Sequence, residues 1–171
     1  MKKPAKVLIV VTLYNLGDYI DEAIQSVFNQ TYQNWELIII NDGSTEEKSK
    51  ERAEFYRKNG DKRVHVFSRK NEGVVKARNF GSKQASYDYI CFLDADDRLR
   101  NDFLQKTVAE LNKDTAKKIG FVTSFYKHFG NSDQLIELPD PDLNFLLIQN
   151  TIHTSSLIRK EAFEKVNGYD S

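Results

Sequence analysis

The chain has 171 residues, and its 25 basic residues balance 25 acidic ones, so the formal net charge is zero. A dedicated nucleic-acid-binding protein normally carries a net positive charge, so we expect no nucleic-acid partner. Hydrophobic residues make up 40% of the chain, which provides for one buried core and argues against intrinsic disorder. No apolar run approaches the ~20 residues that a membrane span requires. A single cysteine, Cys91, excludes an internal disulfide and a multi-cysteine metal site, and we expect it in the core.

Short apolar runs alternate with helical patterns through the first hundred residues. The runs predict four strands, at Lys6–Leu13, Trp35–Ile40, Val64–Phe67 and Tyr87–Leu93. Between them the sequence predicts helices at 20–28, 45–60 and 73–85, and Asp18 is the expected N-cap of the first. Strands that alternate with helices in this way predict an α/β sandwich around a mainly parallel sheet.

The second half is less regular. Leu104, Val108 and Leu111 form the apolar stripe of a further helix, which Asn101 is placed to cap. Beyond it the sequence predicts a strand at Ile119–Tyr126, a long irregular crossing over 127–149, a last strand at Ile152–Ile158 and a last helix at Lys160–Val166. Because there is no internal repeat or linker, we expect one domain.

Three of the predicted strands end in polar clusters. These are Thr12-Leu13-Tyr14-Asn15, Asn41-Asp42-Gly43-Ser44 and Asp94-Ala95-Asp96-Asp97. In an open α/β sheet, ligands bind beyond the carboxyl ends of the strands, so these clusters are expected to share one rim.

Asp94 and Asp96 are the most informative pair. Two residues apart in an extended segment, their carboxylates would point the same way, and Mg²⁺ or Mn²⁺ would offset their repulsion. Such ions favour a few carboxylates together with phosphate oxygens and water. An Asp-rich loop or helix N-terminus has the same spacing, so the residues alone leave metal binding open.

The other candidates each have an ordinary structural explanation. Asp42 would accept a hydrogen bond from a bound nucleotide, or serve only as a turn residue. Tyr14 offers a flat face and a hydroxyl, or packs as an ordinary tyrosine. Lys76 and Arg78, on a predicted helix, would face diphosphate oxygens or remain solvated surface charges.

Several site classes are not predicted. The histidines have no ligand spacing and predict no metal site: they are His65, His128 and His153. His153 lies where a late strand would approach the rim, but a structural histidine is the expectation. The chain lacks GxGxxG and GxxxxGK[ST], which argues against a Rossmann dinucleotide site or a P-loop.

Four stretches carry a family resemblance over essentially the whole chain. They are VTLYNLGDYIDEAIQSVFNQTYQNWELIIINDGST, NEGVVKARNFG, YDYICFLDADD and HTSSLIRKEAFEKVNGYD. In this order they resemble the family 2 glycosyltransferases of the GT-A fold. The resemblance implies one GT-A domain over 1–171, with the nucleotide- and metal-binding half in 1–100 and the start of the acceptor half in 101–171.

The resemblance also implies an activity. It is inverting, metal-dependent transfer of a sugar from a nucleotide-diphosphate donor, most often a UDP-sugar, to a hydroxyl of a glycan or lipid-linked acceptor. Polysaccharide, lipopolysaccharide or other glycan synthesis is the implied process. The expected location is the cytoplasm, including the inner face of its membrane.

The resemblance also implies site residues, at the positions that match the motifs of the family. The donor-binding residues that the resemblance implies are Thr12, Tyr14, Asp42, Lys76, Asp94 and Ala95. Thr12 and Tyr14 would touch the nucleoside and Asp42 the base, while Lys76 would lie near the diphosphate. Asp96, with Asp94, would bind Mg²⁺ or Mn²⁺.

This chain departs from the family pattern in two places. Many members have Pro where Thr12 stands. In the family, an acidic motif that supplies the general base follows the stretch matching Gly168-Tyr169-Asp170, so we expect the base beyond Ser171 and give Asp170 no such role. Loss of a general base costs ~10²–10⁴-fold in rate, so this polypeptide is expected to bind donor better than it turns it over. Apolar surface left uncovered at this end would favour self-association.

Two alternatives remain. A sugar-nucleotide pyrophosphorylase has a Gly-rich loop after its first strand, whereas Thr12–Asp18 holds only Gly17, which disfavours that class. A non-catalytic nucleotide-sugar or glycan-binding module is the alternative from another class, and metal-dependent transfer or donor hydrolysis would separate it from an enzyme.

Overall fold

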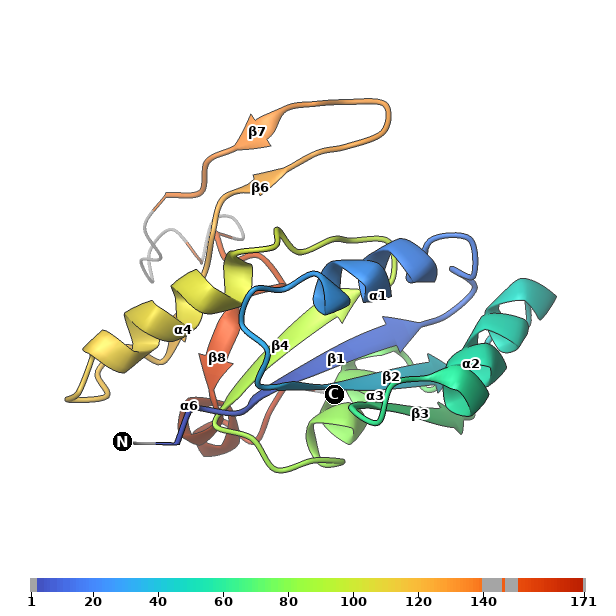
Figure 1. The fold of residues 1–171 in the computed structure, drawn as a ribbon, viewed down its shortest axis with the longest axis horizontal. Helices are drawn as coiled ribbons and strands as arrows, with labels where there is room; N and C mark the ends of the chain where they lie inside the picture. Colours follow the sequence, from blue (N-terminus) through green and yellow to red (C-terminus); the bar gives the residue numbers. More distant parts are fainter. Residues whose placement is uncertain (1–2, 140–145, 147–150, 171) are drawn as a thin grey trace.

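The computed structural model describes residues 3–139, 146 and 151–170. Four parallel strands form most of its main sheet: β1 (Val7–Leu13), β2 (Trp35–Asp42), β3 (Val64–Arg69) and β4 (Tyr89–Asp94). Two short strands extend it beyond β4: β8 (Leu157–Arg159) pairs antiparallel with β4, and β5 (Phe121–Val122) pairs antiparallel with β8. The strand order is β3-β2-β1-β4-β8-β5 (Figure 1). The prediction of an α/β fold around a mainly parallel sheet is confirmed.

Helices cover both faces of the sheet. Residues of β1 alternate between the faces, with Val7, Ile9 and Val11 in one apolar cluster and Leu8 and Val10 in the other. The first cluster packs against α1 (Ile20–Phe28), α2 (Glu47–Asn59) and α4 (Phe103–Lys113), and the second against α3 (Val74–Ser82) and α6 (Lys160–Lys165). Every residue of β1 is buried, which explains its continuous apolar run.

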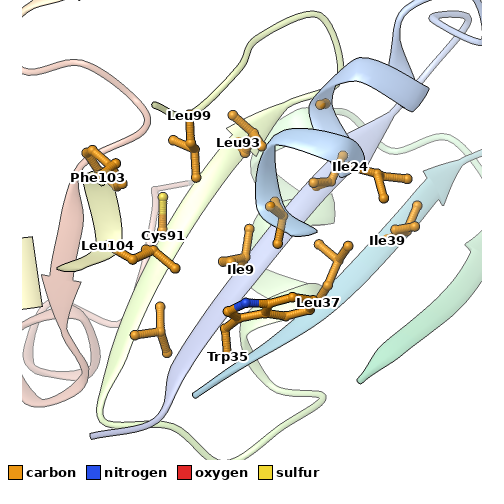
Figure 2. Packing of buried hydrophobic residues seen from close by; sticks show 14 of the residues in the cluster. Ile9, Ile24, Trp35, Leu37, Ile39, Cys91, Leu93, Leu99, Phe103 and Leu104 are labelled. Carbon is orange, nitrogen blue, oxygen red and sulfur yellow. The ribbon is translucent and has the colours of Figure 1, made fainter. Parts of the chain in front are cut away.

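The first cluster is the larger one. Figure 2 shows Ile9, Trp35 and Leu37 from the strands packed beneath Ile24 of α1, with Leu104 of α4 beside Cys91. Cys91 is fully buried, as predicted, and burial raises the pKa of its thiol to about 12.

Both predicted helix caps are wrong. The N-cap of α1 is Tyr19, and Asp18 instead forms an ion pair with Lys48 of α2. The N-cap of α4 is Asp102, without a side-chain hydrogen bond, while the carbonyl of Asn101 accepts the Thr31 N–H at 2.8 Å. Neither Asp18 nor Asn101 is the residue that directly precedes its helix.

The strands of the second half are shorter than predicted. Of Ile119–Tyr126 only Phe121–Val122 joins the main sheet, where it pairs with Ile158 and Leu157 of the three-residue strand β8. The next residues pair in a separate hairpin, β6 (Tyr126–Lys127) with β7 (Leu135–Ile136), which projects from the body (Figure 1). The expected irregular crossing over 127–149 therefore begins as a hairpin, and residues 140–145 and 147–150 of it lie outside the described structure.

Other boundaries move by a few residues. The strand predicted at Ile152–Ile158 is reduced to β8, and the helix predicted over 73–85 ends at Ser82. In contrast, β2 and β3 each run two residues further than expected, to Asp42 and Arg69. Within the described ranges, no helix combines the length and apolar character that crossing a bilayer demands.

Candidate functional site

Strand register brings the three polar clusters to one edge of the sheet. Thr12 at the end of β1 lies opposite Asp94 of β4, and its neighbour Leu13 lies opposite Asn41 of β2. The shared rim predicted from the sequence is thus present. A cleft of about 490 Å³ opens there, lined by Thr12, Leu13, Tyr14, Leu16, Asp42, Asn71, Gly73, Val74, Arg78, Asp94, Ala95 and Asp96.

The acidic cluster after β4 is a tight turn. The Asp97 N–H donates to the Asp94 carbonyl at 3.0 Å, so the segment is not extended and the expected reason for a common direction of the two carboxylates is wrong. Asp94, Ala95 and Asp96 nevertheless all line the cleft. Asp94 is partly buried and Asp96 exposed, and within the described ranges Asp96 makes no hydrogen bond or ion pair. One carboxylate of this rim is therefore open to a ligand.

Arg78, on α3, is the basic side chain of the cleft. Its Nη2 donates to Asp94 Oδ1 at 2.6 Å, and its side chain is only 13% exposed. Its Nε is buried without a hydrogen-bond partner among the described residues. Lys76 does not line the cleft: it is exposed, and its Nζ lies 3.5 Å from Glu72 Oε1. A donor-binding role for Lys76 stays a prediction.

Asp42 is a buried carboxylate at the end of β2. Its Oδ2 accepts the Gly73 N–H at 3.0 Å, and its Oδ1 lies 3.1 Å from Nε of Arg69. That second contact has ion-pair distance but not hydrogen-bond alignment, so Oδ1 keeps its capacity to accept a hydrogen bond. The carboxylate is held in place on one side and able to accept a further donor on the other.

Sequence reasoning missed Arg69. The predicted strand stopped at Phe67, whereas in the structure Arg69 is the last residue of β3 and pairs in register with Asp42. Its guanidinium also forms an ion pair with Glu72 and donates to the Lys76 carbonyl at 3.2 Å. Extending both predicted strands by two residues, to Asp42 and Arg69, would have placed these two residues opposite each other.

Side chains at the ends of β1 and β2 hold this part of the rim together. Asn41 Oδ1 accepts the Ser44 N–H at 3.0 Å, and Ser44 Oγ accepts the Asn15 N–H at 3.2 Å. Asn41 is therefore a turn-forming residue. These contacts fix the loop that carries Tyr14, whose side chain is exposed beside the buried Thr12.

His153 approaches the same turn from the second half of the chain. Its Nε2 lies 4.0 Å from Asp97 Oδ2, and its ring lies 4.7 Å from that of Tyr126. Burial raises the pKa of Asp97; His153 opposes the rise, and the neighbouring Asp94 and Asp96 add to it. The Ser155 N–H donates to Nδ1 of His153 at 3.2 Å, in agreement with a structural histidine.

The rim carboxylates suit a cation that arrives with a phosphate ligand. The described residues hold no group of three or more His, Cys, Asp or Glu side chains placed for a metal. Mg²⁺ and Mn²⁺ do not need one, since one or two carboxylates with phosphate oxygens and water complete their coordination. Asp96 and the oxygen of Asp94 that Arg78 leaves free are the residues that would hold such an ion.

A second hollow, of about 560 Å³, lies between the C-terminal half of α3 and α6. Among the residues that line it are Ser82, Tyr87, Lys160 and Asn167. None of the site residues predicted above is among them, so the cleft at the strand ends is the candidate site.

Comparison with protein families gives a match over most of the chain. The model described as "Glycosyl transferase family 2" matches residues 8–166. An uncharacterized glycosyltransferase of Haemophilus influenzae is 33% identical over 168 residues, which cover 90% of this chain and 51% of that protein. The chain spans between 13% and 58% of the length of the curated relatives that it matches.

Solved structures share the fold. Staphylococcus aureus TarS 1–349 in complex with UDP-GlcNAc superposes with a TM-score of 0.74 at 20% identity, covering 97% of this chain and 48% of that one. The mannosyltransferase PcManGT from Pyrobaculum calidifontis, in complex with GDP-Man and Mn²⁺, also gives 0.74, at 18% identity, covering 98% and 48%. At these identities the likeness establishes the fold alone, which is the GT-A fold of TarS.

Proposed function

Since the chain belongs to glycosyl transferase family 2, we propose that its cleft binds a nucleoside-diphosphate sugar and that the sugar passes to a hydroxyl of a glycan or lipid-linked acceptor. One observation carries the proposal. The cleft gathers three carboxylates and a half-buried guanidinium, those of Asp42, Asp94, Asp96 and Arg78.

On the nucleoside side, Tyr14 and Asp42 have suitable chemistry. Oδ1 of Asp42 would accept an N–H from the base, and the exposed face of Tyr14 would lie against the nucleoside. Both UDP and GDP carry a ring N–H able to donate in this way, so Asp42 by itself does not choose between them. Bound nucleotides in the solved structures above include donors of both classes.

On the diphosphate side, the proposal rests on charge. A bound divalent ion would neutralise diphosphate oxygens and so ease departure of the nucleoside diphosphate. Asp96 and Asp94 would hold that ion, and Arg78 would present its unpartnered Nε as a further donor. In the inverting displacement, the acceptor oxygen forms a bond to the anomeric carbon while the bond to the diphosphate oxygen breaks. A base would take the acceptor's proton, and we propose none of the described residues for that role.

Calorimetric titration tests the proposal. UDP, GDP and dTDP are titrated into the protein with Mn²⁺ and again with EDTA, for the wild type, Asp96→Asn and Asp133→Asn. Asp133 is a matched control, because it is an exposed aspartate on the β6–β7 hairpin, does not line the cleft and, among the described residues, pairs with Lys127. We expect metal-dependent binding of at least one nucleotide, weakened about tenfold or more in Asp96→Asn, or 1.4 kcal/mol, and unchanged in Asp133→Asn.

Two outcomes would contradict the proposal. One is that a folded sample binds none of the three nucleotides in the presence of Mn²⁺. The other is that EDTA and Asp96→Asn leave the affinity unchanged, which would remove the cation and the acidic turn from the site.

A further inference from the structure

The segment after α6 is clamped onto α3. The Asn79 side-chain amide donates through Nδ2 to the Tyr169 carbonyl at 2.8 Å and accepts the Tyr169 N–H on Oδ1 at 2.9 Å. One side chain therefore satisfies both backbone groups of Tyr169, as a paired strand would. Asn79 is the immediate neighbour of Arg78, so the clamp lies next to the basic group of the cleft.

Gly168 makes this close approach possible. The Gly168 N–H donates to the Phe163 carbonyl at 3.0 Å and so ends α6, with φ of +82° at Gly168. A Cβ at this position would lie 2.5 Å from Oδ1 of Asn79. Only glycine combines that backbone conformation with that contact. The chain is therefore delivered to Asn79 in one geometry.

The Tyr169 ring reaches the back of the donor cleft. Its centroid lies 5.2 Å from that of Phe92 and 5.8 Å from that of Phe163. Phe92 stands on β4 two residues before Asp94. Cζ of Arg78 lies 5.6 Å from the Tyr169 ring centroid, while the same guanidinium donates to Asp94. Arg78 is thus held between an aromatic face and a carboxylate, and both hold it in the side of the cleft assigned to the diphosphate.

We propose that Tyr169 is a positioning residue for Arg78, whose ring holds the guanidinium on Asp94 in the orientation that a diphosphate meets. The inference deepens the proposed function and rests on it for the identity of the ligand. Tyr169 itself does not line the cleft; it acts through Arg78. The attraction between a cation and an aromatic face is stronger when the cation is desolvated, and the 13% exposure of the Arg78 side chain meets that condition.

A double-mutant cycle tests the coupling. Tyr169→Phe keeps the ring, and Tyr169→Met keeps apolar volume without it; each is made in the wild type and in Arg78→Gln. Mn²⁺ with UDP, and Mn²⁺ with GDP, are the calorimetric probes. We expect Tyr169→Met to weaken binding of the recognised nucleotide about 2- to 30-fold and Tyr169→Phe to stay within about twofold of the wild type. In Arg78→Gln, Tyr169→Met should have no further effect.

A second readout does not need a nucleotide. In protein labelled with ¹⁵N-arginine, the Arg78 Nε–H resonance is identified by its loss in Arg78→Gln. Tyr169→Phe should preserve its shift and solvent exchange, whereas Tyr169→Met should move the resonance and speed exchange. If that variant is destabilised, Tyr169→Leu replaces it, with melting curves recorded for each.

The two readouts separate the two claims. If no nucleotide binds but the Arg78 resonance responds to loss of the ring, the proposed function fails while the positioning stands. If the resonance is unchanged in Tyr169→Met, or if the loss of affinity persists in Arg78→Gln, the positioning role is overturned.

Discussion

Asp42→Asn should destabilise the fold although it leaves the number of non-hydrogen atoms in the side chain unchanged. In the wild type, Oδ2 accepts the Gly73 N–H, and Oδ1 lies at ion-pair distance from the Arg69 guanidinium, 3.1 Å from its Nε. An asparagine has one oxygen and one NH₂ group. If the oxygen meets Gly73, the NH₂ group faces a donor on Arg69; if it meets Arg69, the NH₂ group faces the Gly73 N–H. Either orientation places two buried donors against each other.

The magnitude follows from one unsatisfied buried donor pair. Such a loss costs about 2 kcal/mol, which lowers the melting temperature of a domain of this size by about 4–8 °C. Circular dichroism melting curves measure it, with Asp133→Asn as the exposed control expected within about 1 °C of the wild type. A melting temperature for Asp42→Asn that equals the control's would refute the reasoning, because Asp42 would then not be held by these contacts.

Three further predictions concern stability. Gly81→Ala places a Cβ 2.5 Å from Cγ1 of Val10, so it should lower the free energy of unfolding measured in urea by about 1–3 kcal/mol. Adding Val10→Ala should recover part of that loss. Full stability of the single variant would contradict the tight packing of α3 on β1. Arg159 is only 6% exposed, and its guanidinium donates to the Leu111 carbonyl at the end of α4. Arg159→Met should lower the free energy of unfolding by about 3 kcal/mol. Burial and the contact with Asp21 raise the pKa of Tyr56 to about 12, so an unfolded tyrosine ionises first, near pH 10. Stability should fall as pH rises from about 10 to about 12, and less steeply in Tyr56→Phe; equal slopes would refute this.

The rim was predictable because its signals are local. Continuous apolar runs identified the parallel strands, and polar residues at their carboxyl ends, such as Thr12 and Asp94, had to meet once those strands were neighbours. The roles of Asp42 and Asp96 as ligands remain predictions, but their position in the cleft follows from strand ends alone.

Local sequence signals could not predict the contact between Arg69 and Asp42, nor which of Lys76 and Arg78 faces the cleft. Arg69 meets Asp42 only through the register of an edge strand, which the sequence specifies weakly. Residues two apart on a helix point about 200° apart, so only one of Lys76 and Arg78 faces the cleft. In the structure Ala77 is buried against the sheet, and this fixes which way Lys76 and Arg78 point. No sequence pattern reports that packing.

The lengths of the strands in the second half were predicted wrongly for a related reason. Phe121 and Val122 have strand-forming neighbours on both sides, but their partner β8 is only three residues long. Strand length there is limited by the partner, and no property of the residues themselves reports it.

Paramagnetic broadening by Mn²⁺ tests the central claim most directly, because it locates the bound ion on the fold. Spectra of ¹⁵N-labelled protein are recorded with the recognised nucleoside diphosphate plus Mg²⁺, and again with Mn²⁺ in its place. We predict that the amide signals of Thr12, Asp94 and Asp96 broaden first, while those of Ser82 and Asn167, in the α3–α6 hollow, broaden least. Broadening centred on the α3–α6 hollow, or none at Asp94 and Asp96, would contradict it.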